Sequence, residues 1–115
     1  LAYSPLARGL LTGKYIGNSI PEGSRLSRDD KIRKIVNENS DLAVKAYCSL
    51  AKKYNIDPVH MSLAFCNERP FMGSVIFGAT DISQLRKILA GINLKLSSEI
   101  NDEIQILYKK FPLTF

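Results

Sequence analysis

The sequence predicts an α/β fold, because two short strand-like segments alternate with longer segments of helical periodicity. Residues 1–4 (LAYS) are too few for a helix, and the proline that follows them lacks an N–H and suits the end of a strand. Residues 74–77 (SVIF) are rich in β-branched and aromatic side chains, as buried strands are. The resulting order is strand, loop, helix, helix, strand, helix, helix, which is typical of α/β proteins.

A loop and a first helix are expected after the first strand. Residues 16–24 have the glycine, proline and serine content of a loop, and residues 26–39 are polar and partly helical. A helix is then expected over residues 41–54, because apolar side chains recur there at helical spacing. Either Ser40 or Asp41 can cap this helix.

The second helix lies before the second strand. Asn55 suits a left-handed residue between the two helices. Asp57 is a cap and Pro58 suits the first helical position, so a largely apolar helix is expected from there to about Glu68. His60 is the only histidine and has no acid or second ligand at metal spacing, so we interpret it as structural.

Two further helices are expected after the second strand. Residues 78–80 turn the chain, and Thr80 or Asp81 can cap a helix over residues 82–90. A turn before a capped helix start is a common place for an anion. A final amphipathic helix is expected to end near residues 109–110. The core face of the helix over residues 82–90 is predicted to be Leu85, Ile88, Leu89 and Ile92.

Composition restricts the class of protein. The chain has 115 residues, which fits one small domain, and it has no apolar run long enough to cross a membrane and no signal peptide. Its first residue is Leu1 rather than Met and stands inside a predicted strand, so we expect a fragment of a longer protein. Cys48 and Cys66 lie in apolar periodic segments, which favours two reduced, buried thiols and a cytoplasmic location over a disulfide or a metal pair.

The net charge of the chain is +5, and the excess of positive charge gathers in residues 25–34, where five cations face only two aspartates. Three interpretations are open: a solvated mobile loop, a loop that closes over an anionic ligand, or a nucleic-acid patch. The third lacks a stacking platform, because no aromatic residue interleaves with the charges. The cations are Arg25, Arg28, Lys31, Arg33 and Lys34.

A second cationic feature follows the first strand. Residues 12–15 (TGKY) form a small corner just past the carboxyl end of that strand, which is where α/β proteins bind ligands. Ser4 offers a hydroxyl, the loop offers N–H groups and Lys14 offers a charge, so the corner suits a phosphate or pyrophosphate.

Four separated motifs carry a resemblance that covers nearly the whole chain. They are AYSPLARGLLTGKY at residues 2–15, SIPEGSR at 19–25, HMSLAFCNERP at 60–70 and SVIFGATDISQLRKI at 74–88. In this order they resemble the aldo-keto reductases, in particular the bacterial aryl-alcohol-dehydrogenase-like and potassium-channel beta-subunit branches.

The resemblance implies a fold and an activity. Two strands cannot close a barrel, so residues 1–115 would be the C-terminal part of one (β/α)₈ barrel domain, with its last two βα units and its C-terminal helices. The intact protein would transfer a hydride from NADPH to an aldehyde or ketone, with no nucleic acid or membrane as partner. The family's catalytic Asp, Tyr, Lys and His lie in the earlier part of the barrel, so no catalytic residue is assigned here and the fragment alone is expected to be inactive. No metal site is expected.

The resemblance also implies which residues bind NADP. Tyr3 matches the aromatic that stacks on the nicotinamide, although without the resemblance a core tyrosine would be favoured. Lys14 matches a phosphate-binding lysine, and Arg25 matches the arginine of the 2′-phosphate, where a guanidinium suits a bidentate contact. The loop along the pyrophosphate is matched by Ser4, Pro5, Leu6, Ala7 and Gly9. The phosphate and ribose end of the second loop is matched by Gly78, Thr80 and Gln84.

The chain departs from the family pattern at one place. The family often has Glu-Asn, which holds the adenine amino group, where this chain has Lys87 and Ile88. Neither side chain can accept that hydrogen bond, so adenine binding is expected to be weaker or differently made, and Lys87 would add charge near the adenosine phosphate. The alternative function is a small basic, helix-rich module that binds nucleic acid or a protein partner, which the helix pair over residues 41–68 and the basic segment suggest.

Overall fold

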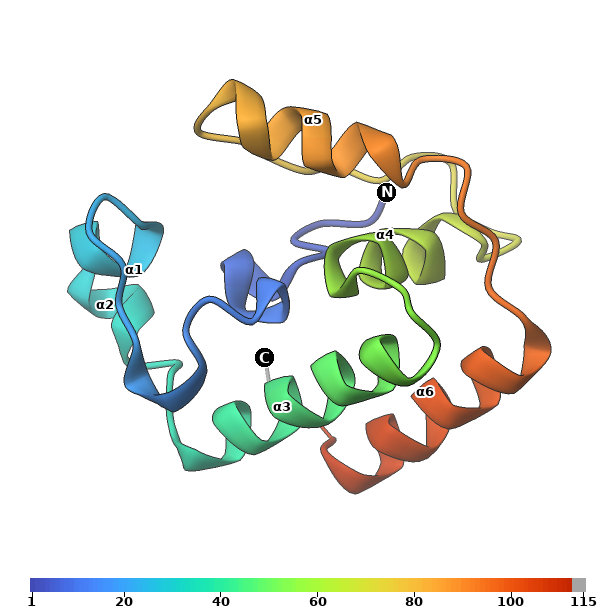
Figure 1. Cartoon of the computed structure of the whole chain (residues 1–115), viewed down its shortest axis with the longest axis horizontal. Coiled ribbons are helices and arrows are strands. Elements are labelled where there is room, and N and C mark those ends of the chain that lie inside the picture. Colours follow the sequence, from blue (N-terminus) through green and yellow to red (C-terminus); the bar gives the residue numbers. More distant parts are fainter. Residues whose placement is uncertain (113–115) are drawn as a thin grey trace.

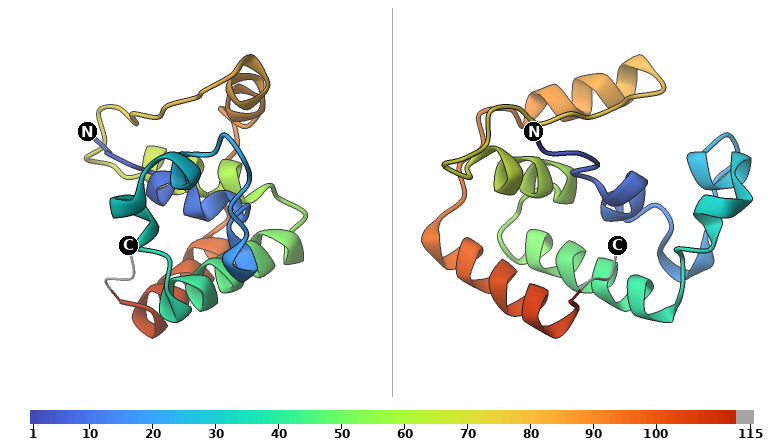
Figure 2. Two further views of the ribbon diagram at one scale, coloured as in Figure 1. Left: turned by 90° about the vertical axis from the view of Figure 1, so that its left-hand side faces the viewer. Right: turned by 180° about the vertical axis from the view of Figure 1, so that it is seen from behind.

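The computed structural model describes residues 1–112, except for the side chain of Ile32, and arranges them in three layers (Figure 1). Helices α3 (Glu38–Lys53) and α6 (Ser98–Lys110) lie side by side in one outer layer. Helix α4 (Pro58–Asn67) and the 3₁₀ segment η1 (Ala7–Thr12) form the middle layer. Helix α5 (Ile82–Ala90) is the other outer layer, and the two further views in Figure 2 show the same order.

Three short helical segments connect η1 to α3. They are η2 (Ile16–Asn18), α1 (Arg25–Arg28) and α2 (Asp30–Arg33). The expected partial helicity of residues 26–39 is therefore confirmed. Leu26 of α1 is fully buried and packs with Leu10 of η1, so the basic segment is anchored to the core. This anchor does not fit the interpretation of that segment as a freely mobile loop.

The two predicted strands are reduced to one parallel bridge between Ala2 and Val75. The Ala2 N–H donates to the Ser74 carbonyl at 2.9 Å, and the Ile76 N–H donates to the Ala2 carbonyl at the same distance. Two short strands without neighbours cannot form an independently stable sheet, because three or more strands or a covering helix are needed. The α/β character is thus present in a helix-rich form, and the length predicted for the strands was wrong.

Helix caps explain most of the helix boundaries. Asp81 caps α5 by accepting the Gln84 N–H, so this helix has the boundaries predicted from the sequence. Asp57 caps α4 and Asn55 has a φ of 54°, as expected. Helix α3 starts earlier than predicted, because the cap is Asn37, and Ser40 is its capping-box partner inside the first turn.

Two buried clusters hold the layers together. One joins η1, α1 and α3 through Ala7, Leu10, Tyr15, Leu26 and Val44. The other joins α3, α4 and α6 through Leu50, Ala51, Met61, Ile100 and Ile104. Within residues 1–112, α5 contributes only Ile88 to the buried residues.

The predicted core face of α5 is therefore largely wrong for this chain. Ile88 is 6% exposed, whereas Leu89 is 45% exposed and Ile92 is 63% exposed. The helix is strongly amphipathic, but most of its apolar side chains meet no cover among the described residues. An amphipathic helix of this kind is typical of a surface that packs on further structure.

Cys48 and Cys66 are free thiols that are half-buried. Burial is the main cause that raises the pKa of both thiols.

No helix within residues 1–112 has the length and hydrophobicity that a membrane span requires. The described residues also contain no group of three or more histidine, cysteine or acidic side chains placed to share a metal ion.

Candidate functional site

The segment after the first bridge residue has an unusual backbone. Ser4, Ala7 and Arg8 all have positive φ angles, of 54°, 48° and 58°, and Gly9 follows with 95°. Residues other than glycine rarely adopt this conformation, and such strain clusters at functional sites when the surrounding structure enforces it. Hydrogen bonds from the Ala7 N–H to the Ser4 carbonyl and from the Gly9 N–H to the Leu6 carbonyl close the turns. We call residues 4–9 the strained loop.

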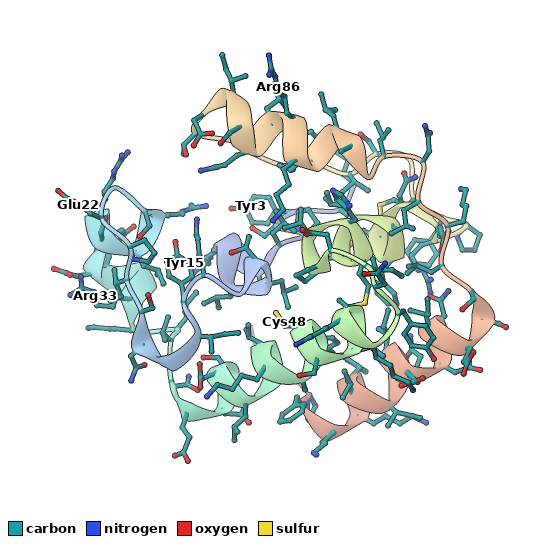
Figure 3. The ribbon with its side chains drawn as sticks, viewed as in Figure 1. Tyr3, Tyr15, Glu22, Arg33, Cys48 and Arg86 are labelled. Carbon is teal, nitrogen blue, oxygen red and sulfur yellow. The ribbon has the colours of Figure 1, made fainter. Side chains whose placement is uncertain are left out.

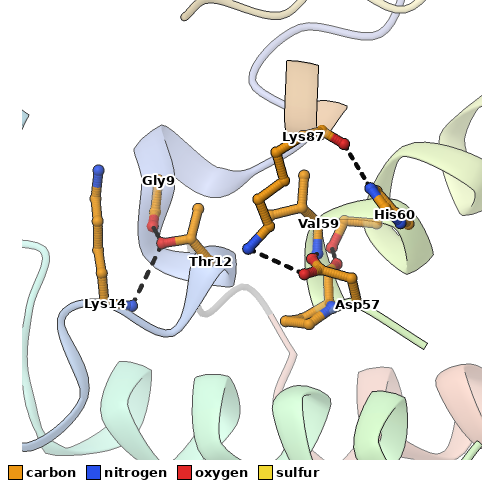
Figure 4. Close-up of polar contacts among 9 residues, drawn as sticks. Gly9, Thr12, Lys14, Asp57, Val59, His60 and Lys87 are labelled. Atoms are coloured by element: carbon orange, nitrogen blue, oxygen red, sulfur yellow. Dashed lines mark hydrogen bonds and ion pairs between the residues drawn. The ribbon is translucent and has the colours of Figure 1, made fainter. Parts of the chain in front are cut away.

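Lys14 lies beside the strained loop (Figure 4). The Thr12 hydroxyl donates to the Gly9 carbonyl at 2.7 Å and accepts the Lys14 N–H at 3.3 Å, which fixes the corner. The Lys14 side chain runs past Gly9, and its Nζ is 5.1 Å from the centre of the buried Tyr15 ring. Among residues 1–112 no carboxylate pairs with Lys14. An exposed cation next to a strained loop suits an anionic ligand.

A cavity of about 770 Å³ opens next to the strained loop. Tyr3, Ser4, Pro5 and Ala7 form one wall, so the structure brings four of the predicted site residues together. The other walls come from α3, α4 and α6 and include the aromatic residues Tyr47, Phe65 and Tyr108.

The Tyr3 ring is available to a ligand. Its side chain is 78% exposed, and Figure 3 places it between α5 and η1. Within the described residues, Tyr3 is therefore not a core side chain. Across the cavity, burial is the main cause that raises the pKa of Tyr47, and Tyr108 adds to the rise. The cavity is therefore bordered by the exposed phenol of Tyr3 and the half-buried phenol of Tyr47.

Sequence reasoning missed the helical walls of the cavity. Tyr47, Phe65 and Tyr108 occur at ordinary apolar positions of their helices, and no local pattern separates a cavity wall from a packed core. Their role could be recognised only once three helices were arranged around one loop.

The second predicted turn forms its own hydrogen-bond network. Asp81 accepts the Gln84 N–H at 2.9 Å, and the Gln84 amide donates back to Asp81 at 2.9 Å. The Thr80 N–H donates to the Gln84 side chain at 3.2 Å. The hydrogen bond from Ser83 is the main cause that lowers the pKa of Asp81. This helix start therefore carries a carboxylate that repels anions, and the exposed Gly78 leaves open space beside it.

Arg25 stands apart from the other predicted residues. It begins α1 and is exposed, and Arg28 ends the same helix. In the view of Figure 1, α1 and the start of α5 both lie on the left of the molecule, with η1 nearer the centre. Within the described residues the structure gives no hydrogen bond between Arg25 and the strained loop.

Lys87 contacts the start of α4 through both its side chain and its backbone. Its Nζ pairs with the Asp57 carboxylate at 2.9 Å, and its backbone carbonyl lies 2.6 Å from Nε2 of His60 (Figure 4). Ile88 is buried. The charge of Lys87 is therefore paired with Asp57, and its place near an adenosine phosphate stays a prediction. The interpretation of His60 as a structural residue fits its contact with a helix carbonyl.

Comparisons with known proteins agree with the four motifs. A model of the aldo/keto reductase family matches residues 1–109. The "Protein tas" of Escherichia coli (strain K12) is 35% identical over 111 residues, which cover 96% of this chain and 32% of that protein. A probable voltage-gated potassium channel subunit beta of Oryza sativa subsp. japonica is 28% identical, with coverage of 96% and 35%.

A third relative is named for an enzymatic activity. The L-glyceraldehyde 3-phosphate reductase of Escherichia coli O157:H7 is 33% identical over 105 residues, which cover 86% of this chain and 30% of that protein. The chain spans about a third of the length of the curated relatives it matches. The family match extends over nearly every residue and includes the strained loop, the corner at Lys14 and the second turn. The chain therefore belongs to the aldo/keto reductase family.

Proposed function

We propose that this chain is the C-terminal, cofactor-binding part of an NADP-dependent oxidoreductase that reduces aldehydes or ketones. The observation that carries the proposal is the strained loop, with the exposed side chains of Lys14 and Tyr3 beside it. The relatives are about three times as long as the chain, so the other strands and the catalytic residues would lie in the rest of a (β/α)₈ barrel.

The uncovered apolar surface supports the assignment to a larger barrel. Residues on both sides of the single bridge remain exposed, and α5 lacks a cover for most of its apolar face. Contiguous exposed apolar surface marks a place where further structure packs. The large exposed side chains include Phe71, Ile76, Ile82 and Leu89.

The residues of the loop fit a dinucleotide. The Tyr3 ring can stack on a flat nicotinamide and present one of its faces to the substrate. The strained loop can place N–H groups along a pyrophosphate, and Lys14 can neutralise its charge. NADPH, when bound, supplies the hydride, while these side chains bind and orient it. In this assignment the pyrophosphate site comprises Ser4, Pro5, Leu6, Ala7, Gly9 and Lys14.

The second turn fits a neutral part of the cofactor better than a phosphate. Thr80 and Gln84 offer a hydroxyl and an amide, whereas the nearby Asp81 carboxylate opposes negative charge. Ribose hydroxyls can donate to these groups, and the open side of Gly78 leaves room for them. The 2′-phosphate is then left to Arg25, which favours NADP over NAD. The free thiols Cys48 and Cys66 suit the reducing cytoplasm.

A binding and activity measurement on the intact protein tests this proposal. We expect the protein to bind NADPH and to oxidise it in the presence of an aldehyde or ketone. Lys14→Ala should weaken NADPH binding by roughly 10-fold or more, because a charge-assisted hydrogen bond is worth about 1.5–3 kcal/mol. The matched control is Lys52→Ala, an exposed lysine on α3. Absence of NADPH binding by the wild type, or equal affinity in the Lys14→Ala variant, contradicts the proposal.

A further inference from the structure

Helices α4 and α5 meet at a contact that involves the only histidine of the chain. Nε2 of His60 lies 2.6 Å from the carbonyl oxygen of Lys87. In a continuing helix this carbonyl would accept the N–H of residue 91, but the Gly91 N–H turns back to the Ile88 carbonyl at 3.2 Å. The Lys87 carbonyl is therefore available at the helix end, and His60 donates its Nε2 proton to it.

An ion pair joins the same two helices one turn away. Nζ of Lys87 lies 2.9 Å from one carboxylate oxygen of Asp57, whose other oxygen caps α4 by accepting the Val59 N–H at 2.8 Å. Burial by itself would raise the pKa of Asp57, but the hydrogen bonds from Lys87 and Val59 outweigh it and lower the pKa. The Asp57 carboxylate thus caps α4 and also holds α5 through its ion pair with Lys87.

Gly91 allows the helices to approach this closely. A Cβ atom at this position would lie 2.2 to 2.7 Å from three atoms of His60, well inside van der Waals contact. The φ of Gly91 is −100°, which any residue can adopt, so glycine is needed here for space rather than for conformation. We call Asp57, His60, Lys87 and Gly91 the α4–α5 clasp.

The clasp holds α5 at one end, and the predicted second cofactor turn lies at the other end. Within the described residues, α5 has only Ile88 buried, so the clasp is its main attachment to this part of the chain. Its nine residues span about 13 Å, and a tilt at the Gly91 end moves the turn that holds Thr80 and Gln84. Figures 1 and 2 show α5 as a layer that lies clear of α3 and α6.

We propose that the α4–α5 clasp is a positioning device that aligns the Thr80–Gln84 turn for the adenosine side of the bound dinucleotide. This inference rests on the proposed function, since it assumes that the turn contacts the cofactor. At the position where the family resemblance implies an adenine contact, Lys87 pairs with Asp57 instead. In this proposal the position of the Thr80–Gln84 turn depends on helix packing rather than on a side chain that binds adenine.

The test measures each half of the cofactor separately in the intact protein. The adenosine half is 2′-phospho-ADP-ribose, the nicotinamide half is nicotinamide mononucleotide, and dissociation constants are obtained by calorimetry. His60→Leu removes the donor at similar volume, whereas His60→Gln keeps an N–H that can reach the Lys87 carbonyl. Asp57→Asn keeps the α4 cap and removes the charge facing Lys87. Gly91→Ala separates the helices, and Gly73→Ala is its control, because a Cβ at Gly73 meets no atom within 4 Å.

We expect each of the variants His60→Leu, Asp57→Asn and Gly91→Ala to lower the affinity for the adenosine half by roughly 2- to 30-fold. This is the range for residues that couple through packing. The nicotinamide half should bind unchanged, and His60→Gln should restore much of the affinity for the adenosine half. Equal weakening of both halves would reveal general destabilisation and overturn the inference, as would unchanged affinity of all variants for the adenosine half. If the wild type binds neither NADPH nor the adenosine half, the proposed function itself fails.

Discussion

Lys53 and Glu103 form an ion pair of 2.7 Å that joins the end of α3 to α6, across 50 residues of sequence. The Tyr54 hydroxyl donates to the same carboxylate oxygen. The hydrogen bond to Glu103 is the main cause that raises the pKa of Tyr54 to about 12 and the main cause that raises the pKa of Lys53. The hydrogen bond from Lys53 is the main cause that lowers the pKa of Glu103.

These shifts predict how pH acts on the contact between α3 and α6. Tyr54 and Lys53 have raised pKa values in the folded state, so their contribution is complete at neutral pH. The contribution of Tyr54 is lost as the pH rises toward about 12, and that of Lys53 is lost as the pH rises through its own raised pKa. Glu103 has a lowered pKa, so its contribution is present above the ordinary value of 4.5 and is lost as the pH falls below it.

The Tyr54 prediction can be checked by alkaline titration. The phenolate absorbance of the wild type minus that of Tyr54→Phe should show one tyrosine with a pKa near 12. In a Glu103→Gln background the same difference should move toward the ordinary value of 10. A Tyr54 that titrates at 10 in the wild type would contradict the network at the end of α3.

The capping box of α3 predicts a loss of stability at one serine. The Ser40 hydroxyl accepts the Asn37 N–H at 2.9 Å and is buried, so Ser40→Ala leaves that N–H without its partner. We expect a loss of about 1 kcal/mol in the free energy of unfolding of the intact protein, measured by urea denaturation. Ser49→Ala, an exposed position on the same helix, should change it by less than about 0.5 kcal/mol. Equal effects of both changes would show that the box does not stabilise α3.

The isolated 115-residue chain is expected to be only marginally stable. The one parallel bridge found within residues 1–112 leaves strand edges unpaired, and Phe71 is 81% exposed. Circular dichroism should show a broad thermal transition at low temperature. A sharp two-state melt of a monomer above roughly 60 °C, the upper end for ordinary mesophilic domains, is the result that contradicts this expectation.

The isolated chain is also expected to lack reductase activity. The residues described contain the predicted cofactor side chains, and the family resemblance places the catalytic residues elsewhere. Purified chain mixed with NADPH and a panel of aldehydes should oxidise NADPH no faster than buffer. Turnover above that rate, abolished by Tyr3→Ala, would show that this chain carries catalytic groups of its own.

Local signals predicted the helices well and the strands poorly. Helix α5 has its predicted boundaries because Asp81 caps it, whereas α3 starts earlier because Ser40 serves as the partner of the Asn37 cap rather than as the cap itself. The strand patterns are present in the sequence, but pairing needs neighbours that are absent from residues 1–112. A local sequence pattern predicts the type of secondary structure more reliably than it predicts which strands pair.

The candidate site was likewise predicted only in part from the sequence. The motifs indicated the strained loop and Lys14, which the structure brings together with the exposed Tyr3. The α4–α5 clasp was not predicted, because the contact of His60 with Lys87 joins residues 27 positions apart and leaves no local pattern. The ion pair between Lys87 and Asp57 was not predicted either, because Asp57 was recognised only as a helix cap.

The cofactor preference of the intact protein tests the central claim most directly. Arg25 and Arg28 belong to the same short, exposed helix and can replace one another, so both are changed together in Arg25→Ala/Arg28→Ala. The matched control is Lys31→Ala/Lys34→Ala, which removes the same charge from the same segment. Dissociation constants for NADPH and NADH are measured by fluorescence titration in all three proteins.

A contact between this helix and the 2′-phosphate predicts that the arginine double variant loses roughly 10- to 100-fold in NADPH affinity, as about 1.5–3 kcal/mol implies. Its NADH affinity should stay nearly constant, since NADH lacks that phosphate, and the lysine variant should keep its preference for NADPH. If NADPH and NADH affinities fall by the same factor, or if the lysine variant loses as much preference as the arginine variant, Arg25 does not bind the 2′-phosphate and the assignment of this chain as an NADP-selecting site is wrong.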